Sequence, residues 1–327
     1  MKNKKILITG SSGFIGTNLT QKLREQDHDV IGIDLVEPRF FPPNKFFQMD
    51  IRNQEEVKKI ILEVLPDFVI HLAAVSTIQQ GAFDENYTWQ VNLTGTNALL
   101  SAIAESKCMP LIIHVSTDKV YGALGEEERY QETMELQPLK DSPYDESKAE
   151  ADKLAQFFSS RLPIVIVRLC NIYGPYDLHM ERVIPGNISK MLMGQNGILN
   201  CYEVNGIQKN FYREMLFIED LCIGFSKLMS AFDKNREAFR GEVFNLGAQS
   251  CYSMEEILCE IQKTVCSDTG ITRRMVENTH ELQRQSLDDS KADVWFGYTP
   301  DTKLSDGIAQ TVEWWREFHL NGGKIYE

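Results

Sequence analysis

A glycine-rich turn near the N-terminus constrains the fold more than any other feature of the sequence. Gly10, Gly13 and Gly16 lie between an apolar strand expected at 5–9 and a helix expected to run to about Gln26. Glycines at this spacing permit a tight turn and let the backbone approach a ligand closely, while the helix N-terminus offers unpaired N–H groups to an anion. A strand, this turn and a helix in succession indicate a dinucleotide-binding unit.

An acidic residue at the end of the second expected strand, 29–34, indicates which dinucleotide is bound. Asp34 follows Gly10 by 24 positions, a spacing that suits a carboxylate on the 2′-hydroxyl of the adenosine ribose. No arginine directly follows Asp34 to hold a 2′-phosphate, since Arg39 lies five residues further on. The pattern therefore favours NAD over NADP, and the alternative interpretation of Asp34 is a turn residue.

Alternation of strands and helices continues through the first 170 residues and predicts the fold class. We expect further strands at 46–50, 67–74, from 112 and at 164–169, with intervening helices at 53–64, 83–106 and 142–160. This pattern is typical of an α/β protein with a Rossmann-type, doubly wound parallel sheet.

The second half of the sequence is less regular. We expect helices at 185–193, 253–266 and 305–320, and strands at 216–220 and 243–247. The predicted organisation is a dinucleotide-binding domain at 1–172, to which 212–247 returns, and a smaller, mixed α/β substrate domain over most of 173–327.

A polar cluster, Ser116 to Lys119, ends the buried strand that begins at Ile112. By itself it is consistent with a capped strand and a turn. Ligands of doubly wound sheets bind at the carboxyl ends of the strands, where the glycine turn, Asp34 and the pair Ala73-Ala74 are also expected. The cluster is therefore a candidate for proton chemistry beside the dinucleotide.

Tyr144 and Lys148 are four residues apart on the helix that Ser142 and Pro143 begin, so they share one face. A neighbouring ammonium, together with a positively charged oxidised nicotinamide, would favour the phenolate and lower the pKa of Tyr144. Such a tyrosine can take a proton from a sugar hydroxyl while the carbon gives hydride to NAD, and Thr117 or Ser116 can hydrogen-bond the same hydroxyl. The Tyr-x-x-x-Lys pattern alone is common and gains meaning only from the glycine turn and the polar strand end.

Composition excludes several other classes of protein. The chain has 327 residues and a net charge of −13, which argues against a nucleic-acid partner. No apolar run is long enough for a membrane span, and residues 6–8 are too short a core for a signal peptide. The seven cysteines form no C-x-x-C pair and the six histidines are isolated, so we expect reduced thiols, no metal site and a cytoplasmic location.

Taken together, the motifs resemble the extended short-chain dehydrogenase/reductase family, whose members act on nucleotide-activated sugars with tightly held NAD. The resemblance covers nearly the whole chain and rests on Gly10-x-x-Gly13-x-x-Gly16, His71-Leu72-Ala73-Ala74, Asn92-x-x-Gly95-Thr96, Ser116-Thr117-Asp118-Lys119-Val120-Tyr121-Gly122, Tyr144-x-x-x-Lys148 and Asn171-Ile172-Tyr173-Gly174-Pro175. It implies a nucleotide-diphosphate sugar as substrate, and a homodimer formed through the helices expected at 83–106 and 142–160.

The resemblance also implies roles for individual residues. The implied cofactor contacts are Gly10, Gly13, Phe14, Ile15, Gly16, Asp34, Asp50, Ile51, Leu72, Ala73, Ala74, Asn92, Ser116, Tyr144 and Lys148. The implied substrate contacts are Ser76, Asn171, Arg182, Arg213 and Arg284, and the implied catalytic residues are Thr117, Asp118, Lys119, Tyr144 and Lys148.

Within this family the polar strand end separates the reactions. Thr117-Asp118-Lys119 resembles CDP-glucose 4,6-dehydratases more than the dTDP-glucose enzymes, which have Asp-Glu at this point. The resemblance implies that Tyr144 takes the C4 hydroxyl proton, that the C5 proton is then removed while a protonated Asp118 acts as the acid for the leaving C6 hydroxyl, and that hydride returns to C6. Lys119 is either the neutral base for C5 or an ammonium that stabilises the enolate.

Two other functions are consistent with the sequence. The first is a nucleotide-sugar epimerase or C4 oxidoreductase of the same family, and CDP-tyvelose-type 2-epimerases have a similar lysine-containing strand end. The second is a regulatory protein that binds a dinucleotide without catalysis, although the intact set of Thr117, Tyr144 and Lys148 speaks against it. The nucleotide base and the sugar stay open.

Overall fold

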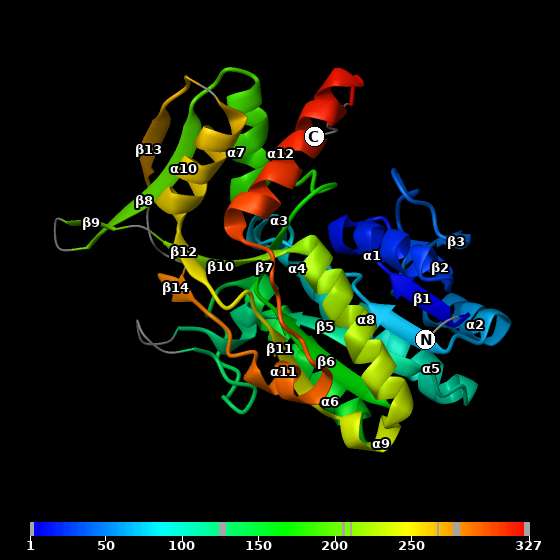
Figure 1. Ribbon diagram of the computed structural model, residues 1–327. Coiled ribbons are helices and arrows are strands. Elements are labelled where there is room, and N and C mark those ends of the chain that lie inside the picture. The colour runs from blue at the N-terminus through cyan, green and yellow to red at the C-terminus, as the bar shows by residue number, and fades with distance from the viewer. Residues whose placement is uncertain are drawn as a thin grey trace.

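A seven-stranded parallel sheet forms the centre of the molecule, with helices on both faces (Figure 1). The computed structural model describes residues 3–123, 129–204, 207–209, 211–266, 268–276 and 282–323. The strand order is β11-β6-β5-β4-β1-β2-β3, and neighbouring strands are parallel throughout. This arrangement confirms the expected doubly wound α/β fold. The strands are β1 (Lys5–Thr9), β2 (Asp29–Asp34), β3 (Lys45–Gln48), β4 (Phe68–His71), β5 (Leu111–Thr117), β6 (Ile164–Leu169) and β11 (Val243–Leu246).

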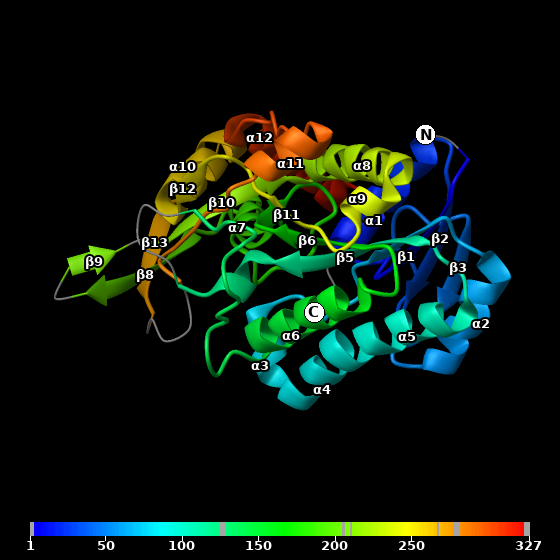
Figure 2. The same ribbon diagram turned by 90° about the horizontal axis from the view of Figure 1, so that it is seen from below.

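Two hydrophobic cores lie on opposite faces of this sheet. Helices α2 (Gln54–Val64), α5 (Thr96–Ser106) and α6 (Pro143–Phe158) cover one face. Helices α1 (Phe14–Glu25) and α8 (Ile218–Lys234) cover the other, as the view in Figure 2 shows. Because both faces are covered, the central strands β1, β4, β5 and β6 are apolar over most of their length rather than alternating.

The segment expected as one helix over 83–106 is helical without a break from Glu85 to Ser106, and a separate short helix, α3 (Ile78–Phe83), precedes it. The long helix consists of α4 (Glu85–Trp89), a π-helical turn (Gln90–Gly95) and α5. Asp84 separates α3 from α4 because its side chain accepts a hydrogen bond from the backbone N–H of Tyr87 at 2.9 Å and so caps α4. The expected helix is therefore confirmed from Glu85 to Ser106, with its start two residues later than the sequence indicated.

Two small sheets follow in the C-terminal part of the chain. In the first, β10 (Tyr212–Phe217) pairs with β7 (Asn171–Tyr173), β12 (Cys251–Ser253) and β14 (Arg284–Gln285). In the second, β8 (Gly197–Val204) pairs with β9 (Ile207–Lys209) and β13 (Ile271–Met275). The helices of this part are α7 (Val183–Leu192), α9 (Arg236–Phe239), α10 (Met254–Val265), α11 (Ser290–Phe296) and α12 (Leu304–Leu320).

The strand expected at 216–220 ends earlier than the sequence indicated. Phe217 is the last residue of β10 and Ile218 begins α8. Glu219 and Asp220 lie in the first turn of that helix, where acidic side chains are favourable to the helix dipole. Among the described residues, none of the helices is both long and apolar enough to cross a lipid bilayer.

Candidate active site

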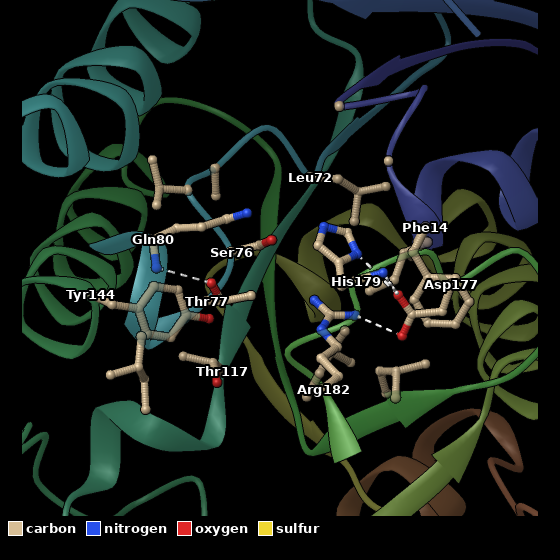
Figure 3. Close-up of a pocket in the computed structure, with 18 of the residues that line it drawn as sticks. Phe14, Leu72, Ser76, Thr77, Gln80, Thr117, Tyr144, Asp177, His179 and Arg182 are labelled. Carbon is tan, nitrogen blue, oxygen red and sulfur yellow. Dashed lines mark hydrogen bonds and ion pairs between the residues drawn. The ribbon is translucent and has the colours of Figure 1, made fainter. Parts of the chain in front are cut away.

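A cavity of about 920 Å³ opens at the carboxyl ends of the central strands. Its lining joins the residues that follow β1, β2, β4 and β5 to side chains of α6 and of the C-terminal part. In the close-up of Figure 3, Tyr144 and Thr117 lie on one side of the cavity, and Asp177, His179 and Arg182 lie on the other. The polar residues that we expected at one edge of the sheet, at the ends of neighbouring strands, therefore do line one cavity.

The turn after β1 is shaped for close contact with a ligand backbone. Gly10 has a φ of +73°, and a Cβ atom there would lie 2.8 Å from the backbone nitrogen of Ala73. The backbone conformation and the lack of space therefore each exclude a side chain at this position. Helix α1 begins at Phe14, and no side chain caps its N-terminus. Its first N–H groups are therefore available to a phosphate group at the cavity wall.

Asp34 lies at the end of β2 and lines the same cavity. Its carboxylate accepts hydrogen bonds from the backbone nitrogens of Ser12 at 2.9 Å and Leu35 at 2.7 Å. Burial raises the pKa of Asp34, and these N–H groups oppose the rise. The carboxylate is thus fixed beside the glycine turn, where a ribose hydroxyl of a dinucleotide can reach it.

Asp50 and Ile51 line the cavity after β3. The Asp50 carboxylate is paired with Arg52, whose Nη2 lies 2.6 Å from Oδ2, and this hydrogen bond lowers the pKa of Asp50. Leu72, Ala73, Ala74 and Ser76 line the cavity after β4. The small side chains, the uncapped helix and the glycine turn together fit an adenine dinucleotide.

The strand end after β5 supplies a buried acid and a lysine. The Thr117 hydroxyl donates a hydrogen bond to Asp118 Oδ1 at 3.1 Å, and Lys119 Nζ lies 3.6 Å from the same oxygen. Asp118 is only 2% exposed, and its other oxygen, Oδ2, has no hydrogen-bond partner among the described residues. One carboxylate oxygen is therefore held in place, while the other is buried beside the cavity without a partner among the described residues.

Tyr144 and Lys148 both line the cavity from α6, as their spacing predicted. In the protein without cofactor, burial raises the pKa of the Tyr144 phenol, Asp145 adds to the rise and a hydrogen bond with Thr117 opposes it. The lowering expected from Lys148 together with an oxidised nicotinamide stays a prediction. The Lys148 ammonium instead donates to the carbonyl oxygen of Val115 at 2.7 Å. Burial lowers the pKa of Lys148 to about 8.

The wall that faces Tyr144 in Figure 3 contains an ion-paired group that the sequence did not reveal in full. Asp177 is 1% exposed and accepts hydrogen bonds from His179 Nδ1 at 2.9 Å and Arg182 Nη1 at 3.3 Å. Arg182 was expected at the substrate, but Asp177 and His179 were missed. Two polar residues shortly before an arginine at the start of a helix would have been the available signal.

Most residues expected in the site line the cavity, and two do not. Ser116, Asn171 and Arg213 are in the lining, together with the glycine turn and the catalytic candidates. Asn92 lies behind the lining, where its amide accepts a hydrogen bond from Val75 N at 2.8 Å and donates one to Ser147 Oγ at 3.0 Å, so it supports the wall. Arg284 is exposed and outside the lining.

The residue after Arg284 does reach the catalytic strand end. Gln285 is 1% exposed, and its side-chain oxygen accepts a hydrogen bond from Lys119 Nζ. Alternate residues of a strand point to opposite faces. In β14 the side chain of Gln285 therefore points inward and that of Arg284 points outward. Among the described residues no group of three or more His, Cys, Asp or Glu side chains is arranged to hold a metal ion.

The chain is similar to enzymes of known activity along nearly its whole length. It is 30% identical to the dTDP-glucose 4,6-dehydratase of Xanthomonas campestris pv. campestris, over 94% of this chain and 92% of that protein. Its fold matches the crystal structure of a dTDP-glucose 4,6-dehydratase from Streptomyces venezuelae with NAD bound, with a TM-score of 0.82, 27% identity and coverage of 96% and 97% of the two chains.

Epimerases are also among the similar structures. A Thermus thermophilus UDP-glucose 4-epimerase in complex with NAD matches with a TM-score of 0.83 and 26% identity, over 95% of this chain and 99% of that one. The model of the NAD dependent epimerase/dehydratase family matches residues 6–247. The glycine turn, Asp34 and the match to this family agree on NAD as the cofactor, and the chain belongs to the NAD-dependent epimerase/dehydratase family.

Proposed function

We propose that the protein is an NAD-dependent nucleotide-sugar 4,6-dehydratase, which converts a nucleotide hexose into its 4-keto-6-deoxy product with loss of water. The observation that carries the proposal is the buried Asp118 carboxyl group, which lies beside Thr117 at the cavity wall and has one oxygen without a hydrogen-bond partner among the described residues. Oxidation at C4 needs only a tyrosine and a hydroxyl donor, whereas loss of the C6 hydroxyl needs an additional acid. We assign this role to Asp118.

In the proposed reaction Tyr144 takes the proton of the C4 hydroxyl, and Thr117 hydrogen-bonds the same oxygen. The glycine turn and Asp34 would hold NAD at the cavity wall; when bound, it would supply the acceptor for hydride from C4, the donor for its return to C6, and a positive ring that favours the phenolate. The ketone at C4 makes the C5 proton acidic. Asp118 protonates the leaving C6 hydroxyl, and Lys119 either takes the C5 proton as a neutral amine or stabilises the enolate as an ammonium while another base at the cavity takes that proton. The same base gives the proton back to C5 when the hydride reaches C6.

Substrate recognition is assigned to the C-terminal wall of the cavity. Arg182 and Arg213 can bind the diphosphate of the nucleotide sugar as hydrogen-bond donors. Asn171 and Ser76 line the same cavity and complete the proposed contacts, while Arg284 would have to turn inward to join them. The two dehydratases named above act on dTDP-glucose, whereas Thr117-Asp118-Lys119 resembles the CDP-glucose enzymes, so both nucleotides belong in the test.

The second candidate is a nucleotide-sugar epimerase of the same family. It is supported by the fold match to an epimerase and by the shared oxidation residues Thr117, Tyr144 and Lys148. An epimerase needs no acid for a leaving hydroxyl, so it leaves the buried Asp118 without a role.

The test is incubation of the purified protein with dTDP-, CDP-, UDP- and GDP-hexoses, read by mass spectrometry and NMR. A product lighter by one water with a 4-keto-6-deoxy sugar supports dehydration. A product of unchanged mass with inverted configuration would sink the proposal in favour of epimerisation.

We also propose a cytoplasmic homodimer that assembles through α5 and α6, with a dinucleotide domain at 1–172 and a substrate domain over most of 173–327. The support is the family resemblance and the exposed Phe157 on α6, which is 60% exposed. Light scattering on the purified protein tests the assembly: a mass of one chain would contradict it.

A further inference from the structure

Lys119 is held from a part of the chain that lies 166 residues away in sequence. Its Nζ donates to the side-chain oxygen of Gln285 and lies 3.6 Å from Asp118 Oδ1. Both neighbours are hydrogen-bond acceptors, one of them a carboxylate. The side chain of Lys119 is 13% exposed, so these contacts replace most of the water that a lysine on a surface turn would have.

Among the described residues, the side-chain amide of Gln285 has no polar partner other than Lys119. It is 1% exposed, and its Nε2 atom has no hydrogen-bond partner among the described residues. Burying an amide that is only half satisfied costs free energy relative to an apolar side chain of the same shape. Among the described side chains, only the hydrogen bond from Lys119 offsets the cost of burying the Gln285 amide.

The strand that carries Gln285 is fixed to the substrate wall. In the pairing of β14 with β10, Gln285 lies opposite Arg213, which lines the cavity. Arg213 Nη1 also donates to the carbonyl oxygen of Gln283 at 3.4 Å. The position of Gln285, and with it that of Lys119, is therefore set by the same strand pair that presents Arg213 to the substrate.

We propose that Gln285 is a positioning residue for Lys119, whose ammonium it holds beside Asp118 at the catalytic strand end. The inference rests on the proposed dehydration and adds a residue from the C-terminal sheet to its machinery. Gln285 does not touch the substrate in this arrangement. It acts by restricting Lys119 to one geometry, in which the lysine and the acid face the same part of the cavity.

The test is a double-mutant cycle on turnover with Lys119→Met and Gln285→Met. Gln285→Met keeps the length of the side chain and removes the acceptor, and we expect kcat to fall about 10- to 100-fold, the factor expected for a lost hydrogen bond to a charged group. The KM for the nucleotide sugar stays unchanged. Adding Gln285→Met to Lys119→Met should cost nothing further, whereas independent effects would multiply and overturn the inference.

Two further variants separate positioning from folding. Gln285→Glu retains an acceptor at the same reach and should restore most of kcat. Ser286→Ala alters the next residue, whose hydroxyl contacts Glu214 and Arg129 rather than Lys119, and should leave kcat unchanged. A loss of kcat in Ser286→Ala equal to that in Gln285→Met would assign the effect to disturbance of the strand.

A readout without turnover keeps the inference separate from the proposed function. Labelling of the Lys119 amine by an amine-reactive ester, followed by peptide mass spectrometry, should be faster in Gln285→Met than in wild type and unchanged in Ser286→Ala. Equal rates in all three proteins would overturn the inference. If no nucleotide hexose loses water, the proposed function fails, while the labelling rates still decide whether Gln285 holds Lys119.

Discussion

The Nζ atom of Lys148 lies 2.7 Å from the carbonyl oxygen of Val115, so the α6 lysine is tied to the catalytic strand β5. Burial lowers the pKa of Lys148 to about 8. The ammonium is therefore present below that pH and is lost above it. In the proposed reaction this charge favours the phenolate of Tyr144, which is needed for oxidation.

We accordingly expect kcat/KM to decline as the pH rises through about 8, with the midpoint set by Lys148. Lys148→Arg keeps a positive charge throughout this range and should move the decline to higher pH. The measurement is a pH–rate profile of both proteins with the substrate identified by the hexose panel. A decline at the same pH in both would assign it to another group.

Tyr144→Phe should abolish the first step. Removal of a general base costs about 10²- to 10⁴-fold in rate, and the phenol is the group that faces the cavity from α6 beside Thr117. The measurement is the absorbance of bound NADH after nucleotide sugar is added in a single turnover. Rapid formation of NADH in Tyr144→Phe would remove the tyrosine from the oxidation.

Asp118→Asn should separate oxidation from elimination. The amide keeps the shape of the side chain and cannot deliver a proton to the leaving hydroxyl. We therefore expect NADH to form and accumulate, and release of the dehydrated product to slow by about 10²- to 10⁴-fold. Full dehydration by this variant would contradict the role of Asp118 and leave the epimerase as the better proposal.

The cofactor half of the site could be predicted from the sequence because local patterns determine it. The glycine turn, Asp34 and the strand end at Ser116 to Lys119 each follow directly from a strand of the alternating region. Parallel strands in a doubly wound sheet bring such ends together without any knowledge of side-chain contacts. The same reasoning predicted the cavity residues of α6, since Tyr144 and Lys148 are one helical turn apart.

The substrate half of the site was harder to predict from the sequence because it depends on short elements that are far apart in the chain. Strand β14 has two residues and β12 has three, too few for a period of two to be visible. Gln285 could not be linked to Lys119 across 166 positions, and the family resemblance drew attention to Arg284 instead. Asp177 and His179 lie in an irregular segment where no periodicity indicates which side chains face inward.

A further prediction concerns an aromatic contact between the segment that follows Asp34 and the last helix, α12. Phe40, in the segment between β2 and β3, packs against Tyr176 at 5.0 Å and Trp314 at 5.8 Å between ring centroids. Phe40→Ala removes this contact from the segment that follows Asp34. We expect a loss of stability of about 2 kcal/mol, less than for a fully buried ring, and weaker retention of NAD.

The measurements for Phe40→Ala are thermal unfolding and the NAD content after gel filtration. Leu320→Ala is the control, since Leu320 lies at the end of the same helix as Trp314 and is 85% exposed. Unfolding of Phe40→Ala at the wild-type temperature, with NAD fully retained, would show that the aromatic contact does not stabilise the segment.

Glu214 makes the stability of the protein depend on pH. Its carboxyl group is fully buried and accepts hydrogen bonds from Leu287 N at 2.9 Å and Arg129 Nη2 at 3.2 Å. Burial raises the pKa of Glu214 from 4.5 to about 7, against the opposing effect of these partners. Between these two values the folded state holds a proton that the unfolded state has released, so this group makes stability fall as the pH rises from 4.5 to 7.

The Glu214→Gln side chain has no proton to lose in this range, so the stability of the variant should not fall with pH on account of this residue. The two proteins should be similarly stable near pH 4.5, and the variant should be more stable at pH 8 by on the order of 3 kcal/mol. Urea unfolding at a series of pH values measures the difference. Arg129→Gln removes the cation that lowers the pKa of Glu214 and should extend the fall in stability to higher pH. Parallel curves for wild type and Glu214→Gln would mean that the buried carboxylate is fully compensated by Arg129 and the Leu287 N–H group.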